Sequence, residues 1–172
     1  MQETLKDLKV RRSCRSYKTE QIKAEELNLI LEAGTYAPTG MGMQSPIMVV
    51  VQDQETIQKL SEMNAAVMGK SDIDPFYGAP TVVIVLADKN RPTYVCDGSL
   101  VIGNLMNAAH AIGVGSCWVH RAKEMFESDE GQKLLKKWDI KGDYAGIGNC
   151  ILGYAVEEAE AKPRKDKYIY LV

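Results

Sequence analysis

The sequence has few of the residues from which metal and haem sites are built. Its 172 residues include only two histidines, His110 and His120, and four cysteines that are far apart and form no C-x-x-C pair. Zinc and haem sites need histidine and cysteine ligands at short, regular spacings. This scarcity argues against a resident metal ion, and we predict none.

Long apolar runs and an excess of positive charge are also missing. No segment approaches the ~18 apolar residues of a membrane span, and the start, MQETLKDLK, lacks the apolar stretch of a secretory signal. The net charge is −2 and the isoelectric point is near 5.8, whereas proteins that bind nucleic acids or anionic membranes usually have a basic face. We therefore expect a cytoplasmic protein with reduced cysteines and with no nucleic-acid or membrane partner.

Several common signatures of enzyme active sites are absent too. The sequence shows no P-loop, no persuasive Ser-His-Asp triad and no pair of catalytic carboxylates. The stretch GVGSCW, residues 113–118, lacks the third glycine of a dinucleotide fingerprint and follows a predicted helix rather than a strand. It predicts no Rossmann site for a nicotinamide cofactor, and its Cys117 is interpreted as a small buried apolar residue rather than a nucleophile.

What is present is the composition and periodicity of one globular domain. Apolar residues make up 45% and charged residues 26%, so we expect a single domain over residues 1–172. Helical spacing predicts helices over residues 4–10, 19–38, 54–63, 97–113 and 128–138. Apolar, β-rich runs predict strands over residues 47–53, 81–88, 114–120, 149–155 and 168–172. Their alternation with the helices by itself favours a parallel sheet.

The helix predicted over residues 97–113 is apolar around nearly its whole circumference. Asp97 is its expected N-cap, because aspartate accepts a hydrogen bond from the free N–H groups of a first turn. A helix with so little polar surface belongs in a core or at a subunit interface.

Three arginines crowd the stretch VRRSCRSY, which begins at Val10. If this stretch is extended, side chains alternate, so that Arg11, Ser13, Arg15 and Tyr17 share one side and Arg12 takes the other. Two guanidinium groups and a hydroxyl on one side suit a phosphate, because arginine forms charge-assisted bidentate hydrogen bonds. Considered alone, the stretch fits a solvated basic turn better, since short basic clusters are common.

Two further stretches have a functional and an ordinary interpretation. The stretch AKPRKDK near the C-terminus contains Lys162 and Arg164, which could close on the same phosphate or form a salt-bridged surface loop. In APTGMGMQSP, the glycines Gly40 and Gly42 allow a backbone to approach a ligand closely, and Gln44 can pair with the edge of a heterocycle. Considered alone, each of these two stretches fits its ordinary interpretation better.

Taken in order, these pieces resemble the nitroreductase family of FMN-dependent oxidoreductases. The resemblance runs from about Val10 to the end of the chain and consists of RRSCRSY, APTGMGMQSP, AIGVGSCWV, LGYA and KPRK. It implies an α+β fold with a mixed, mostly antiparallel central sheet flanked by helices, in place of the parallel sheet. It also implies an intertwined homodimer with FMN at the subunit interface, in which residues 168–172 pair with the partner's sheet.

The resemblance also implies which residues bind FMN. They are Arg11, Arg12, Ser13, Arg15, Pro38, Thr39, Gly40, Gln44, His120, Arg121, Lys162 and Arg164. The basic residues and the serine would hold the phosphate and ribityl chain, and the loop from Pro38 to Gly40 would reach the flavin from the partner subunit. The backbone at His120 and Arg121 would place an amide near flavin N5, where it stabilises negative charge.

The family reaction is a ping-pong transfer of hydride from NADH or NADPH, through FMN, to a small acceptor such as a nitroaromatic or a quinone. Alternatives on the same scaffold are reductive dehalogenation, ene reduction, flavin fragmentation, or a flavin-binding role without turnover. The chain departs from the family pattern at Gly42, where asparagine is usual, and at Ser45-Pro46, where Pro-Trp is usual. The sequence does not place the family's mid-chain flavin contacts, and the loop of residues 69–80 is shorter than in larger members of the family.

Overall fold

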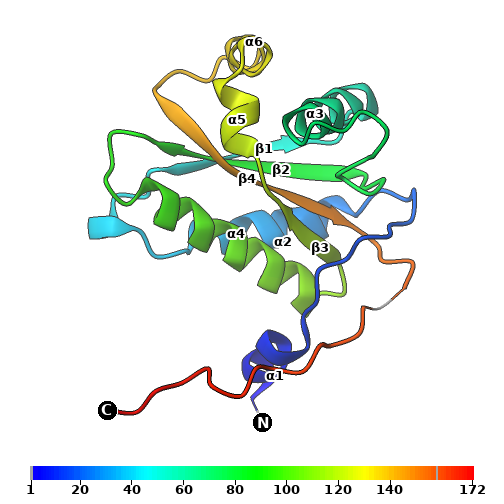
Figure 1. The fold of residues 1–172 in the computed structure, drawn as a ribbon, viewed down its shortest axis with the longest axis vertical. Helices are drawn as coiled ribbons and strands as arrows, with labels where there is room; N and C mark the ends of the chain where they lie inside the picture. Colours follow the sequence, from blue (N-terminus) through cyan, green and yellow to red (C-terminus); the bar gives the residue numbers. More distant parts are fainter. Residues whose placement is uncertain (1, 158) are drawn as a thin grey trace.

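The computed structural model describes residues 2–157 and 159–172 (Figure 1). In chain order its elements are α1 (Glu3–Val10), α2 (Ala24–Thr35), the short 3-10 helix η1 (Gly40–Gly42), β1 (Pro46–Val51), α3 (Gln54–Val67), β2 (Thr81–Asp88), α4 (Tyr94–Ala111), β3 (Gly115–Val119), α5 (Ala122–Glu127), α6 (Asp129–Lys137) and β4 (Tyr144–Gly153). No described helix is long and apolar enough to span a bilayer.

The four strands form one antiparallel sheet in the order β1-β2-β4-β3. The N-terminal segment continues this sheet beyond β3, through a parallel bridge between Ser13 and Ser116 and an antiparallel bridge between Tyr17 and Ala155. The α+β fold with a mixed, mostly antiparallel sheet is therefore confirmed, and the parallel sheet favoured by simple alternation is wrong.

Helices cover both faces of the sheet (Figure 1). Helices α2 and α4 lie on one face, and α3, α5 and α6 lie on the other. Strand β2 contributes alternate residues to both cores: Ile84 packs toward α3 and α5, while Val83 and Val85 pack toward α2 and α4. Because both of its faces are covered, β2 is an unbroken apolar run with no polar alternation.

Several predicted boundaries differ from the observed ones. Helix α4 begins at Tyr94 with Thr93 as its N-cap, so Asp97 lies in the first turn and is not the cap. Helix α2 begins only at Ala24, and residues 168–172 form no strand within this chain. Strand β4 begins at Tyr144, five residues before the predicted start, and the six residues of α5 were missed because they are too few to show a periodicity.

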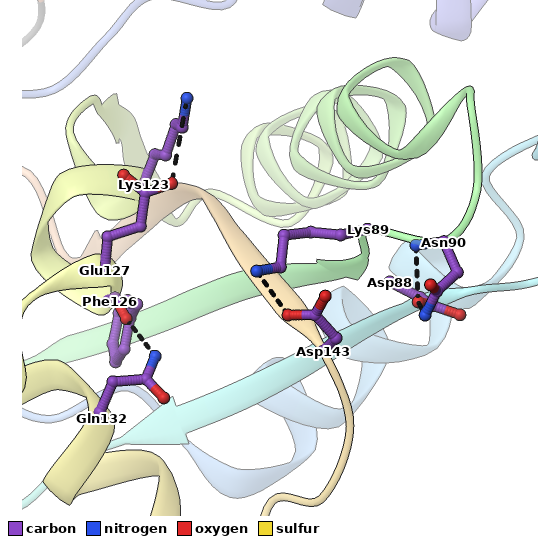
Figure 2. Close-up of polar contacts among 8 residues, drawn as sticks. All are labelled: Asp88, Lys89, Asn90, Lys123, Phe126, Glu127, Gln132 and Asp143. Atoms are coloured by element: carbon purple, nitrogen blue, oxygen red, sulfur yellow. Dashed lines mark hydrogen bonds and ion pairs between the residues drawn. The ribbon is translucent and has the colours of Figure 1, made fainter.

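Polar contacts join the segment after β2 to the segment before β4, and join α6 to α5 (Figure 2). Lys89, just after β2, forms an ion pair with Asp143, just before β4, and Asp88 accepts a hydrogen bond from Asn90. Gln132 of α6 donates to the carbonyl of Phe126 in α5 at 2.6 Å. Such exposed pairs contribute little free energy each, so they define turns more than they stabilise the core.

Candidate functional site

The N-terminal arginines lie on an extended segment at the edge of the sheet. Arg11 Nη1 is buried and has no hydrogen-bond partner among the described residues, whereas the Arg15 side chain is exposed. Arg12 Nη1 donates to the carbonyls of Lys9 at 2.8 Å and of Arg11 at 2.7 Å. Arg12 therefore caps the end of α1 through Nη1, while Arg11 Nη1 and Arg12 Nε are buried donors without a partner among the described residues.

Tyr17 does not share a side with the arginines, which corrects the expected alternation. It is buried in the same core cluster as Cys14, and its hydroxyl donates to the Cys14 carbonyl at 2.9 Å. Burial, together with three neighbouring thiols, raises the pKa of Tyr17 above its ordinary value, so it stays neutral. Cys14 and Tyr17, three residues apart, both face the core, so the regular two-residue alternation fails between Arg15 and Tyr17.

The side chain of Cys117 in β3 shows that the basic segment converges. Burial raises the pKa of the Cys117 thiol, and this rise is opposed by a hydrogen bond with Ser13 and by the charges of Arg15 and Arg11. These three N-terminal side chains therefore lie within electrostatic reach of one position on β3. Cys117 is 3% exposed, which confirms its interpretation as a buried apolar residue.

A cleft of about 370 Å³ opens at the C-terminal end of β3. Its lining residues are Arg15, Met68, Ile73, Asp74, Pro75, Tyr77, Cys117, Trp118, Val119, His120 and Arg121. It brings together three residues that the sequence assigned to FMN, namely Arg15, His120 and Arg121. The loop whose role the sequence left open forms the opposite wall.

That wall is fixed by the carboxylate of Asp74. It accepts hydrogen bonds from Ser61 Oγ at 2.5 Å, from the Phe76 N–H at 2.8 Å and from the Gly78 N–H at 2.6 Å. An aspartate that binds the N–H two residues ahead is a common turn signal, and Asp74-Pro75 carries it in the sequence. The signal predicts a turn, but it does not reveal that the turn faces the end of β3.

The link between β3 and α5 has an unusual backbone. Arg121 is left-handed, with φ 76° and ψ 10°, which is strained for a residue other than glycine. Asn64 of α3, which is fully buried, donates its Nδ2 hydrogen to the His120 carbonyl at 2.7 Å. A Cβ at Gly146 of β4 would lie 2.2 Å from the Ala122 carbonyl oxygen, so only glycine lets α5 begin this close to the sheet.

The loop from Pro38 to Gln44 is anchored to the start of α4. The buried carboxylate of Asp97 accepts from the Gly40 N–H and from the Thr93 hydroxyl, both at 2.9 Å. Thr39 Oγ1 accepts from the Gln44 N–H at 2.9 Å. Asp97 thus holds a loop that lies 57 residues away in the chain, and this explains why it is not free to cap its own helix.

This loop lies apart from the cleft. It lines a separate hollow of about 700 Å³, which shares no lining residue with the cleft. Figure 1 shows the two loops at opposite ends of the sheet, with residues 39–44 on the left and residues 69–80 on the right. A single chain therefore does not bring Pro38, Thr39, Gly40 and Gln44 to Arg15, His120 and Arg121.

The C-terminal basic pair is not brought to the arginines either. Lys162 and Arg164 are exposed in an extended tail, and no ion pair involves either of them in the part of the chain that the structure describes. The tail ends, with the N-terminus, on the side of the sheet that α4 covers (Figure 1).

Comparisons with known proteins agree with this fold. The model of the Nitroreductase family matches residues 8–154. A nitroreductase from Bacteroides fragilis, solved with bound FMN, is 31% identical and superposes with a TM-score of 0.91 over 100% of both chains. A nitroreductase from Desulfitobacterium hafniense, also solved with bound FMN, is 27% identical, with a TM-score of 0.88 over 100% of both chains.

A curated relative from Bacillus subtilis carries the name FMN reductase [NAD(P)H]. It is 25% identical over 186 residues, which cover 95% of this chain and 70% of the relative. The chain belongs to the nitroreductase family. It is therefore an oxidoreductase, as the sequence resemblance implied.

Proposed function

We propose that this protein binds FMN and catalyses ping-pong transfer of hydride from NADH or NADPH to a small acceptor such as a nitroaromatic or a quinone. The observation that most directly supports this proposal is the buried Nη1 of Arg11, which has no partner among the described residues and lies near Ser13 and Arg15. A buried guanidinium donor without an acceptor is costly, and a phosphate group would satisfy it. The FMN bound by two similar solved nitroreductases supplies such a phosphate.

The basic residues at and beside the cleft would together hold the phosphate end of the cofactor, and of these Arg15 lines the cleft itself. Arg11, Ser13 and Arg15 would bind the phosphate and the ribityl chain. Arg12 would add positive charge nearby while its Nη1 remains on the end of α1. Lys162 and Arg164 would close on the same phosphate from the C-terminal tail, which is free to move toward it because it is exposed.

The end of β3 would hold the reactive edge of the flavin. When bound, FMN supplies the hydride chemistry, because it can accept a hydride from NAD(P)H and donate one to the acceptor. The Arg121 N–H would donate at the N5 edge of the flavin, where it would stabilise the negative charge that the ring gains on reduction. The wall fixed by Asp74 would limit the access of water and shape the space for the acceptor.

We further propose a homodimer in which each FMN site is shared. Apolar side chains are left uncovered on Leu5 and Leu8 of α1, on Val95 and Leu100 of α4, and along residues 168–172. A second copy would cover them, and would bring the partner's Pro38, Thr39, Gly40 and Gln44 to the cleft that they do not reach in their own chain. The tail would pair with the partner's sheet.

The visible spectrum of the purified protein tests the proposal. We expect a yellow protein that NADH or NADPH bleaches anaerobically and that a nitroarene or a quinone recolours. Flavin extracted by heat should be FMN. A colourless protein that takes up no flavin would contradict the cofactor, and a yellow protein that neither nucleotide bleaches would indicate flavin binding without turnover.

Two further proposals from the sequence accompany this one. We place the protein in the cytoplasm and treat residues 1–172 as a single domain. Cell fractionation tests the first, and limited proteolysis of the FMN-loaded protein tests the second, because one domain should resist cleavage between its elements.

A further inference from the structure

Asn64 donates a hydrogen bond to the carbonyl of the His120–Arg121 peptide from the interior of the protein. No motif in the sequence indicates this role for Asn64. We propose that Asn64 is a positioning residue for the flavin reaction: it orients and polarises this peptide so that the Arg121 N–H points into the cleft. The inference rests on the proposed function, because the group that receives this N–H would be the flavin. It adds to that function a residue outside the lining of the cleft.

The orientation follows from the planarity of the peptide. The His120 carbonyl and the Arg121 N–H belong to one trans peptide, and in a trans peptide these two groups point in opposite directions. Asn64 Nδ2 holds the carbonyl at 2.7 Å on the interior side. The N–H must therefore point away from Asn64, toward the cleft that His120 and Arg121 line, and it donates to no described residue.

Asn64 is itself well placed to fix this geometry. Its side chain is fully buried on α3, and Nδ2 also contacts the Met125 sulfur of α5 at 3.2 Å. The left-handed conformation of Arg121 is strained, and strained backbones persist only where their surroundings hold them. Asn64 supplies one such restraint, and the close approach of Gly146 to Ala122 supplies the other.

The same hydrogen bond has an electrostatic effect. Hydrogen bonds in a chain polarise one another, so donation to the His120 carbonyl makes the Arg121 N–H a stronger donor. A fixed donor aimed at the place where negative charge develops stabilises the charged state without reorganisation. Asn64 should therefore favour reduced FMN over oxidised FMN, although it touches neither.

Asn149 of β4 provides a matched control. It is also fully buried, its Nδ2 also contacts the Met125 sulfur, at 3.5 Å, and its Oδ1 likewise has no partner among the described residues. Only Asn64 reaches the His120 carbonyl. A purely structural role of a buried amide in this core would therefore affect both positions alike.

The test compares Asn64→Leu with Asn149→Leu in the FMN-loaded protein, by the midpoint potential of the bound flavin and by the Kd for oxidised FMN. In Asn64→Leu we expect reduced FMN to be weakened about tenfold relative to oxidised FMN, which lowers the two-electron potential by about 30 mV. In Asn149→Leu the potential should stay at the wild-type value. Should either leucine variant fail to fold, Asn64→Ser and Asn149→Ser replace the pair, because the shorter serine hydroxyl does not reach the carbonyl.

The outcomes separate this inference from the proposed function. Wild-type protein that binds no FMN overturns both. Wild-type protein that binds FMN, together with equal potentials in the two variants of a pair, overturns only the role of Asn64. A fall in potential confined to the Asn64 variant supports it.

Discussion

The two parts of the proposed flavin site differ in what holds them. The cleft at the end of β3 is built from buried restraints, namely the Asn64 bond to His120, the approach of Gly146 to Ala122 and the carboxylate of Asp74. The loop of residues 38–44 and the C-terminal tail are largely exposed, with Met41 94% exposed. The restraints on the first part all come from one chain, whereas the second part is the surface that we propose a second copy covers.

The exposed part is nevertheless positioned at one point. Asp97 is 3% exposed and accepts from the Gly40 N–H, so the loop is attached to the start of α4, while its tip at Met41 is exposed. The cleft is thus fixed by contacts in the interior of the chain, whereas the loop of residues 38–44 is attached at its base and exposed at its tip. Four predictions test this difference, from the largest expected effect to the smallest.

Gly146→Ala should have the largest effect, because it breaks the interior part. The new Cβ would lie 2.2 Å from the Ala122 carbonyl oxygen and 2.4 Å from its carbon, and backbone atoms cannot move aside as a flexible side chain can. We expect a loss of about 3 kcal/mol in the free energy of unfolding, at the upper end of overpacking. Urea denaturation of the flavin-free protein measures it.

Gly103→Ala in α4 is the control for that measurement. Apart from the neighbouring backbone of α4 itself, no atom lies within 4 Å of the added Cβ. In a helix interior, alanine is more favourable than glycine by about 1 kcal/mol. An unfolding free energy of Gly146→Ala within ~0.5 kcal/mol of the wild type would show that the start of α5 is not fixed by this approach.

Asp97→Ala should detach the loop of residues 38–44 from the start of α4. It leaves the Gly40 N–H and the Thr93 hydroxyl without their acceptor, and a typical intramolecular hydrogen bond contributes about 1 kcal/mol net. We expect about 2 kcal/mol lower stability and weaker FMN binding, because the loop would no longer be held for the partner's cleft. Flavin fluorescence titration of the apo-protein checks the binding.

Asp97→Asn retains an acceptor oxygen and should lose less than Asp97→Ala on both measurements. Unchanged FMN affinity in Asp97→Ala, at concentrations where the protein is dimeric, would mean that the loop takes no part in the flavin site.

Arg15→Ala and Arg164→Ala test whether the two parts meet at one phosphate. Arg15 lines the cleft, and Arg164 lies in the tail. Each variant should weaken FMN binding by about tenfold, or 1.4 kcal/mol, because each removes a charge-assisted hydrogen bond. Riboflavin lacks the phosphate, so its binding should hardly change.

The exposed Lys165 and Lys167 serve as controls in the same tail, and their alanine variants should bind both ligands within about twofold of wild type. Equal losses for FMN and riboflavin in Arg15→Ala would place that arginine on the ring or in the fold. A loss in Arg15→Ala alone would separate the tail from the site.

Lys89→Ala should have the smallest effect. Its ion pair with Asp143 is exposed and lies at the end of the sheet, and its hydrogen bond with Asp143 raises the pKa of Lys89 above its ordinary value (Figure 2). Because that pKa is raised, the contribution is present at neutral pH and is lost only as the pH rises through the raised value. FMN affinity at neutral pH should stay within about twofold of wild type, and a larger loss would connect this end of the sheet to the cleft.

Much of the architecture could be predicted from local pattern. The apolar run of β2 and the charged helix α6 were placed within a residue or so, since periodicity reports which faces are buried. The start of β4 was missed because Gly146 and Gly148 are typical of a turn, although close approaches of Ala122 and Trp118 require them in a strand. Local propensity cannot report a neighbour that is distant in the chain.

The candidate site divides in the same way. The sequence by itself determined the family and the type of fold, because the order of the motifs from RRSCRSY to KPRK carries the resemblance, whereas alternation alone favoured a parallel sheet. Only the tertiary structure paired Asn64 with His120, 56 residues away, and Asp97 with Gly40, 57 residues away. In each pair a buried side chain, Asn64 or Asp97, meets a backbone group that is distant in the chain, and the folded packing alone decides which group that is.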